Sequence, residues 1–430
     1  MIFRQVIRHL LMFCLIASMS LPLLAGGEAS LASMPNFEFP YYGQTLTATA
    51  IDAIKVKSVR DHDVARAWRE YQQRDAESVL SSLRGISDQL GLNDWFVFQL
   101  VRSYVDGLLV DATPIDRVLL EHYLLVKLNY DVRLARTERQ LILMVPFDQE
   151  VYEHEFIRVG GKDYYLFFDD LEADRNEKSV IYPCDPSKKD IGKGRIFSLS
   201  FDDKPLTLPS AGNRLCDFDD GMIRLTCEVS PCLMKMLNDY PLMDLRFYAV
   251  SVVLPQFRAA IEDQLRPQLE GMSQCDAADV LLHFVQSVFG YQDDLDQFGR
   301  DKVNFVEENF YYDNNDCDDR SVLFAYLVNS LLGLDVQFVQ YPGHDCTGVR
   351  FTECSTRGNG YYIGDDYYLI CDPSYVGATI GRCMPMFSST KPVVKTMHPV
   401  LASDGLTPPL EPRLDKRLIV ADISLDPAVL

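Results

Sequence analysis

The chain contains 430 residues, of which 47% are hydrophobic and 24% charged, and its formal net charge is −21 at pH 7. This length is enough for two or three domains with packed cores, and the hydrophobic content excludes disorder of the whole chain. No basic cluster is dense enough to follow a phosphate backbone. The composition therefore argues against nucleic acid and anionic membrane surfaces as partners.

Residues 1–30 have the pattern of a secretory signal peptide. Arg4 and Arg8 precede an apolar run over residues 10–24, and small residues follow from Ala25. Pro22 and the shortness of the run disfavour an uncleaved anchor. We therefore expect export to the periplasm or the extracellular space, without stable membrane insertion.

Helical periodicity begins after an unassigned segment that ends near residue 61. It predicts helices over 63–90, 93–108 and 114–128. The period of the apolar residues then changes to two, which predicts strands over 132–134, 141–145, 155–158 and 164–168. Residues 31–170 are interpreted as one domain, in which helices precede a sheet.

A β-rich bridging segment is predicted over residues 171–250, with strand candidates at 195–199, 222–227 and 245–250. Helical patterns resume over 256–271 and 275–289, inside a second domain at 251–390. Residues 391–430 form a proline-punctuated tail with one strand candidate, 418–420.

Residues 315–324 have the features of a helix start. Asp316 is a good N-cap, and Asp319 three residues later completes a variant of the capping box. Apolar residues continue at helical spacing as far as a closing Gly333. Cys317 therefore lies in the first turn, where unpaired N–H groups and the helix dipole favour a thiolate.

Two further polar residues follow on candidate strands. A strand-like run at 336–339 leads into a turn that ends at His344, and a second run, 367–371, ends at Asp372. The order is a cysteine at a helix start, a histidine at the edge of one strand and an aspartate at the edge of the next. A reactive thiolate needs a base and a group that orients the base, and these three residues could supply all of them.

Residues 240–385 resemble the transglutaminase-like (papain-like) cysteine enzymes, above all the transglutaminase-like domains of exported Bacteroidetes proteins. The matching stretches are LLHFVQSVFGYQ, DQFGRDK, NDCDDRSVLFAYLVNSLLGL, YPGH and YYLICDPSY. The resemblance implies an α+β fold in which a catalytic helix packs on an antiparallel sheet. It implies Cys317 as nucleophile, His344 as base and Asp372 as orienting partner. The implied activity is that of a peptidase, amidase or transamidase acting on a protein or peptide, without cofactor or metal.

The tetrahedral oxyanion would be held by the backbone N–H of Cys317 and one further donor. Gln297, in the DQFGRDK stretch, is the candidate donor, and an exposed loop glutamine is the alternative interpretation. Asp316, Asp318 and Asp319 crowd the thiol and disfavour its ionisation, unless they point to solvent or cap the helix.

An internal repeat precedes this region. Asp116-Arg117 lies 203 positions before Asp319-Arg320, and the tetrapeptide Asp-Tyr-Tyr-Leu at 163–166 lies 203 before its copy at 366–369. The repeat predicts that residues from about 93 to 170 form a degenerate copy of the unit at about 275–375, with the same strand order. In that alignment the counterparts of the three site residues are Pro114 for Cys317, Gln140 for His344 and Asp169 for Asp372.

Two other interpretations stay open. One is a catalytically inactive binding or scaffold protein of the cell envelope that keeps the fold. The other is a metal site built on Cys317, His344 and Asp372, for which no ligand-spacing motif is present. Ten cysteines remain after the signal peptide, with no CxxC pair among them, and export permits disulfides without requiring them.

Overall fold

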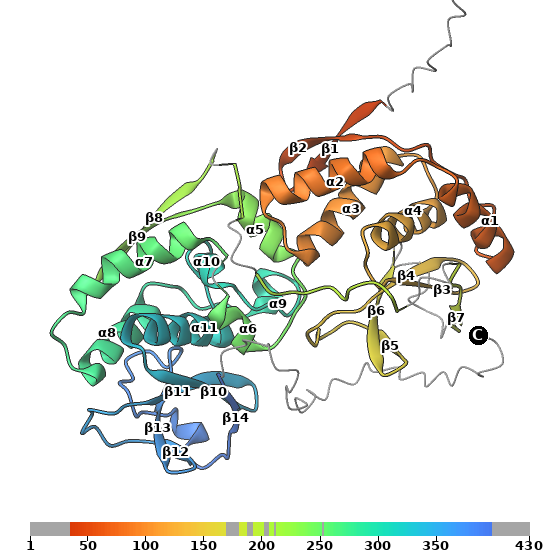
Figure 1. The fold of residues 1–430 in the computed structure, drawn as a ribbon. Helices are drawn as coiled ribbons and strands as arrows, with labels where there is room; N and C mark the ends of the chain where they lie inside the picture. The colour runs from red at the N-terminus through yellow and green to blue at the C-terminus, as the bar shows by residue number, and fades with distance from the viewer. Residues whose placement is uncertain are drawn as a thin grey trace, which may run out of the picture. The chain divides into compact units, whose positions relative to one another are not determined.

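The computed structural model describes residues 35–168, 180–186, 192–201, 206–209, 212–251 and 253–397 (Figure 1). They form a mixed α+β fold that contains two antiparallel five-stranded sheets. The expected signal peptide, Asp169 and the strand candidate at 418–420 lie outside the described residues.

The N-terminal part starts with a β-hairpin that the sequence left unassigned. It consists of β1 (Asn36–Tyr41) and β2 (Gln44–Thr49). Four helices follow: α1 (Asp61–Gln72), α2 (Glu77–Leu90), α3 (Asp94–Leu108) and α4 (Pro114–Lys127). The single helix expected over 63–90 is thus two helices. Asp75 starts the second one by accepting a hydrogen bond from the N–H of Glu77 (3.0 Å).

The first sheet contains the four strands predicted between 132 and 168. They are β3 (Arg133–Arg136), β4 (Leu141–Val145), β5 (Phe156–Val159) and β6 (Lys162–Phe168), joined by the short β7 (Tyr182–Pro183). Their order in the sheet is β5-β6-β4-β3-β7. Helix α4 packs against β4.

The segment 171–250 is only partly β-structured. A hairpin of β8 (Arg214–Asp219) and β9 (Arg224–Val229) agrees with the candidate at 222–227, whereas residues 195–199 make only isolated bridges. Two helices follow, α5 (Pro231–Asn238) and α6 (Leu245–Val250). The strand prediction at 245–250 was wrong because Asp244 caps a helix there, accepting from the N–H of Arg246 (3.1 Å).

The C-terminal part repeats the order of helices before a sheet. Its helices are α7 (Pro255–Gln268), α8 (Gln274–Ser287), α9 (Asp294–Gln297), α10 (Val306–Asn309) and α11 (Cys317–Leu327). A π-helical turn, Val328–Leu332, extends α11 to Gly333, whose φ of 65° ends it as predicted.

The second sheet has the order β12-β13-β11-β10-β14. Its strands are β10 (Asp335–Tyr341), β11 (His344–Arg350), β12 (Gly360–Ile363), β13 (Asp366–Cys371) and β14 (Val393–Thr396), and a 3₁₀ turn, Pro385–Phe387, precedes β14. Helix α11 packs against β11 and β10 (Figure 1).

The two sheets share their strand order and their register, as the repeat predicts. Three ladders of the first sheet contain the pairs Leu134–Leu143, Leu143–Phe167 and Ile157–Tyr164. Adding 204 to every number gives Phe338–Thr347, Thr347–Cys371 and Tyr361–Tyr368, which are pairs of the second sheet. One constant shift therefore reproduces three ladders.

This register corrects one detail of the sequence alignment. The shared Asp-Tyr-Tyr-Leu tetrapeptide suggested a shift of 203 in the last strand, which would place Asp169 opposite Asp372. The pairs show a shift of 204, so the counterpart of Asp372 is Phe168. Gln140 remains the counterpart of His344, because that comparison already used a shift of 204.

A disulfide joins Cys275, in the first turn of α8, to Cys354, 79 residues later and just after β11. Such a bond is consistent with an extracytoplasmic location. Within the described ranges, the helices are too short or too polar for any of them to cross a bilayer.

We predict that Cys354→Ser lowers the free energy of unfolding by about 2–5 kcal/mol, because the bond closes a long loop in the unfolded chain. Urea unfolding of the wild type and the variant, with and without reductant, measures this. Reductant should destabilise the wild type and leave the variant unchanged. A wild type insensitive to reductant would contradict the prediction.

Candidate active site

Cys317 is the first residue of α11, as predicted, and the capping box around it is present. Asp316 accepts from the N–H of Asp319 (3.4 Å), and the Asp319 carboxylate accepts from the N–H of Asp316 (3.4 Å). Asp319 also accepts from the backbone and side-chain amides of Asn304, at 2.7 and 2.8 Å. The helix start is therefore fixed to the segment that precedes α10.

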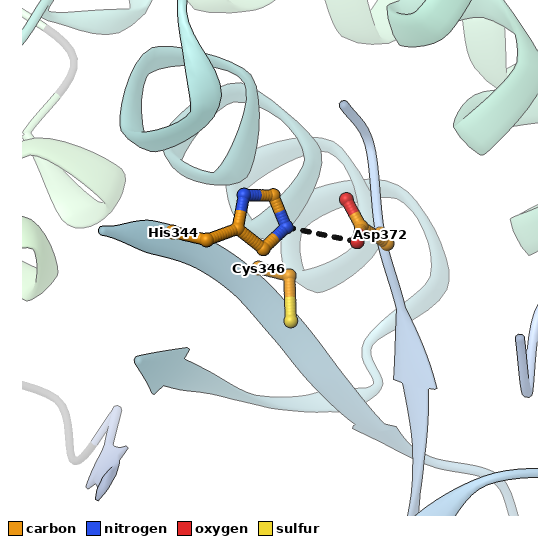
Figure 2. A group of neighbouring side chains, drawn as sticks. All are labelled: His344, Cys346 and Asp372. Carbon is orange, nitrogen blue, oxygen red and sulfur yellow. Dashed lines mark hydrogen bonds and ion pairs between the residues drawn. The ribbon is translucent and has the colours of Figure 1, made fainter. Parts of the chain in front are cut away.

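His344 is the first residue of β11 and follows a tight turn. Pro342 and Gly343 form the turn, and the φ of Gly343 is 72°, a conformation that favours glycine. The His344 Nε2 lies 2.9 Å from the Asp372 Oδ2, at the end of β13 (Figure 2). The structure thus brings together the predicted base and its predicted orienting partner.

Asp372 is held from both sides. Its second carboxylate oxygen accepts from the N–H and hydroxyl of Ser374 and from the N–H of Tyr375, each at 3.1 Å. The buried Gln286 of α8 donates to the Asp372 carbonyl oxygen (3.0 Å). A carboxylate accepting these bonds leaves His344 Nε2 as the donor, so in the neutral imidazole Nδ1 is the atom able to take a proton.

The Cys317 thiol lies against the start of β11. The backbone N–H of Asp345, the residue after His344, is near enough to the thiol to lower its pKa, although other causes outweigh this effect. The hydroxyl of Ser321 donates to the carbonyl oxygens of Cys317 (2.7 Å) and Asp345 (3.1 Å), and so ties the first turn of α11 to this strand.

The faces of β11 show what a contact between Cys317 and His344 requires. Val349 belongs to the core that contains α11, whereas Cys346 belongs to a smaller cluster with Phe387 on the other face of the sheet. The His344 ring stacks on the Phe387 ring, with centroids 5.1 Å apart. The His344 ring and α11 therefore lie on different faces of the sheet. A contact between His344 Nδ1 and the Cys317 sulfur would have to pass around the N-terminal end of β11, and that contact stays a prediction.

The thiol is surrounded by carboxyl groups, as the sequence indicated. Burial raises the pKa of Cys317 above its ordinary value, and Asp318 and Asp316 raise it further. The helix dipole stabilises an anion by about 0.3–1 kcal/mol, less than one pKa unit, and does not offset these effects. The thiol is therefore protonated at rest, and His344 would have to remove the proton during the reaction.

The carboxyl groups near the thiol are buried as well, and burial raises their pKa values. Burial raises the pKa of Asp316 to about 7, with further contributions from Asp319 and Asp294. The pKa of Asp294 is also raised to about 7, by burial and then by Asp318. Burial likewise holds the pKa values of Asp318 and Asp319 well above the usual range. Part of this cluster is thus uncharged near neutral pH.

Gln297, the predicted oxyanion donor, lies close to the site but is engaged. Its side-chain amide donates to the carbonyl oxygen of Asn314 (3.4 Å), three residues before Cys317. Its role in holding an oxyanion stays a prediction.

Tyr291 and Arg320 are neighbours of the thiol that the sequence did not single out. Tyr291 is 53% exposed. Burial of its hydroxyl raises its pKa, and Cys317 is the next cause. Arg320 is 1% exposed, donates to the carbonyl oxygens of Phe289 (2.8 Å) and Gly290 (3.0 Å), and lies 5.5 Å from the Tyr291 ring. In the sequence, only the dipeptide Gly290-Tyr291 could have pointed to these neighbours of the thiol. Gly290 has to be a glycine, because a Cβ there would lie 2.1 Å from the Asn314 side chain.

Four groups of side chains among the described residues could hold a metal ion. Three of them are drawn from the carboxyl cluster, with or without Cys317. The group that contains His344 and Asp372 has Cys346 as its third member. The metal site considered from the sequence had Cys317 in that place.

We predict that the protein loses stability as the pH rises from about 4 to about 7. Over this range the folded chain binds protons at Asp294 and Asp316 that the unfolded chain, with carboxyl pKa values of 3.8, has already released. Urea midpoints at pH 5 and pH 8 measure the slope. Asp294→Asn should flatten it, whereas Asp296→Asn, which removes an exposed charge from the same helix, should not. Equal slopes in both variants would contradict the assignment.

No protein-family model matches this chain, and no curated protein is detectably similar to it. What the chain does must therefore be inferred from the geometry of these residues.

Proposed function

We propose that the chain is an exported cysteine-dependent acyl-transfer enzyme that acts on amide bonds of a protein or peptide. The observation that supports the proposal is the hydrogen bond between His344 Nε2 and Asp372 Oδ2, together with the position of Cys317 in the first turn of the helix that packs against the strand of His344. A base oriented by a carboxylate, next to a cysteine, is the arrangement that nucleophilic catalysis requires.

The reaction would proceed through a thioester. His344 Nδ1 takes the proton of the Cys317 thiol as the sulfur attacks the amide carbonyl carbon, and Asp372 stabilises the imidazolium. The tetrahedral intermediate collapses, the C–N bond breaks, and the imidazolium gives its proton to the leaving amine. Water then cleaves the thioester in a peptidase or amidase, whereas a second amine takes the acyl group in a transamidase.

The oxyanion would form at the start of α11. The first N–H groups of a helix have no partner within the helix, so the backbone N–H of Cys317 is available as a donor. Gln297 is the candidate for the second donor. The hydroxyl of Tyr291, close to the thiol and half exposed, is an alternative that the fold adds.

We further propose that the N-terminal helix and sheet are a degenerate copy of the catalytic unit. The shared register supports this, and so do the caps: Thr113 and Asp116 form a capping box at α4 like that of Asp316 and Asp319. Pro114 replaces the thiol, and its fixed φ suits the first position of a helix. At the positions equivalent to Cys317 and His344 this copy has Pro114 and Gln140, which supply neither nucleophile nor base.

An inactive scaffold is the second candidate function. The raised pKa of Cys317 favours it, and so do the different faces of the sheet on which α11 and the His344 ring lie. The reactivity of the thiol separates the two candidates.

We predict that iodoacetamide alkylates Cys317 at least about tenfold faster than Cys232 at neutral pH, because general-base assistance is worth a factor of 10² or more. Cys232 is the matched internal control, since it is also half-buried and also lies in the first turn of a helix. Peptide mass spectrometry of the alkylated chain measures both rates. His344→Ala should reduce the rate at Cys317 to that at Cys232. Equal rates in the wild type would favour the scaffold.

We also predict that Cys317→Ala abolishes release of amines from peptide amides and incorporation of a fluorescent primary amine. The free energy of unfolding should change by less than about 1 kcal/mol, because the residue is a half-buried helix start rather than a core position. A loss of several kcal/mol, as for a core truncation, would identify Cys317 as a packing residue.

A further inference from the structure

A third side chain lies beside the His344–Asp372 pair. Cys346 is two residues after His344 on β11 and therefore points to the same face of the sheet. The ladder between β11 and β13 pairs Thr347 with Cys371, and continued by one residue it sets Cys346 opposite Asp372. A ring nitrogen of His344, the Cys346 Sγ and a carboxylate oxygen of Asp372 all lie within 4.8 Å of one another (Figure 2).

These three donors are the ones that zinc prefers. Imidazole nitrogen, carboxylate oxygen and thiolate sulfur bind zinc at about 2.0–2.3 Å, so neighbouring donors of a tetrahedral centre lie about 3.3–3.7 Å apart. The 2.9 Å between His344 Nε2 and Asp372 Oδ2 is slightly shorter than this spacing. Forming the centre would require the side chains to rotate so that the three donors face one ion.

Burial selects the kind of ion. Cys346, Asp372 and His344 are 0%, 1% and 7% exposed, so an ion among them must be neutralised by its ligands. A divalent ion with one thiolate, one carboxylate and one neutral imidazole forms an uncharged set. Calcium and magnesium prefer oxygen ligands, and this set supplies a single carboxylate.

We propose that His344, Cys346 and Asp372 bind a divalent transition-metal ion of the zinc class, with water as the fourth ligand, and that this ion switches the enzyme off. Binding releases the Cys346 thiol proton to solvent. The ion replaces the hydrogen on His344 Nε2, and a neutral imidazole bound through Nε2 carries its hydrogen on Nδ1. The atom that should accept the Cys317 proton is then blocked. This effect on activity rests on the proposed function, whereas metal binding does not.

Cobalt(II) tests the site directly, because a tetrahedral cobalt–thiolate centre has a charge-transfer band in the near ultraviolet. We expect the full chain to take up one cobalt ion with this band, and zinc to displace it. Cys346→Ser should weaken uptake at least about tenfold, as loss of a metal-site partner does. Cys371→Ala, in an equally buried position on the next strand, and Cys317→Ala should both keep the band.

Three outcomes would overturn the proposal: no cobalt uptake by the wild type, uptake unchanged in Cys346→Ser, or a band lost in Cys317→Ala instead. Urea midpoints show whether Cys346→Ser is folded, and Cys346→Ala serves as the second variant if it is not. Saturating zinc should slow alkylation of Cys317 in the wild type to the rate of His344→Ala, and should leave the rate in Cys346→Ser unchanged.

The two proposals fail separately in these measurements. Fast alkylation of Cys317 without cobalt uptake would remove only the metal site. Cobalt uptake with equal rates of alkylation at Cys317 and Cys232 would contradict only the proposed enzyme activity.

Discussion

The candidate site depends on the register of one antiparallel ladder, between β11 and β13. Pairing of Thr347 with Cys371 sets Asp372 diagonally across from His344, close enough for a hydrogen bond. A slip of one residue would turn the two side chains to opposite faces. Gly348 helps to hold the register. A Cβ there would lie 2.2 Å from the Tyr361 hydroxyl, so only a glycine leaves room for the Tyr361 ring.

Local patterns predicted the parts of the site that short-range chemistry determines. The capping residues placed Cys317 in the first turn of α11, and the Pro-Gly turn placed His344 at the start of a strand. Periodicity failed at 245–250, where alternating apolar residues suit a strand, because the cap made by Asp244 starts a helix. The alignment of the Asp-Tyr-Tyr-Leu tetrapeptides was one residue out of register, because identical residues need not occupy equivalent positions in the two strand ladders.

What the sequence could not supply were relations between distant segments. Nothing local showed that Asp294 and Asp316 share one buried cluster, or that Gln286 holds the loop after Asp372. The position of Cys346 beside His344 required the pairing of two strands. The spacing of the cysteines likewise gave no sign that Cys275 and Cys354 are bonded, because residues 79 apart meet only in the folded chain.

The Cys275–Cys354 bond has a consequence for when the site is assembled. Cys275 lies in the first turn of the helix whose Gln286 supports Asp372, and Cys354 follows the strand that begins at His344. The bond thus links the helix that supports Asp372 to the strand that carries His344. Inside a reducing cytoplasm it would be missing, and the helix and the strand would be held only by non-covalent contacts. The helix and the strand are therefore joined covalently only in a compartment that is oxidising enough for the bond to form and persist.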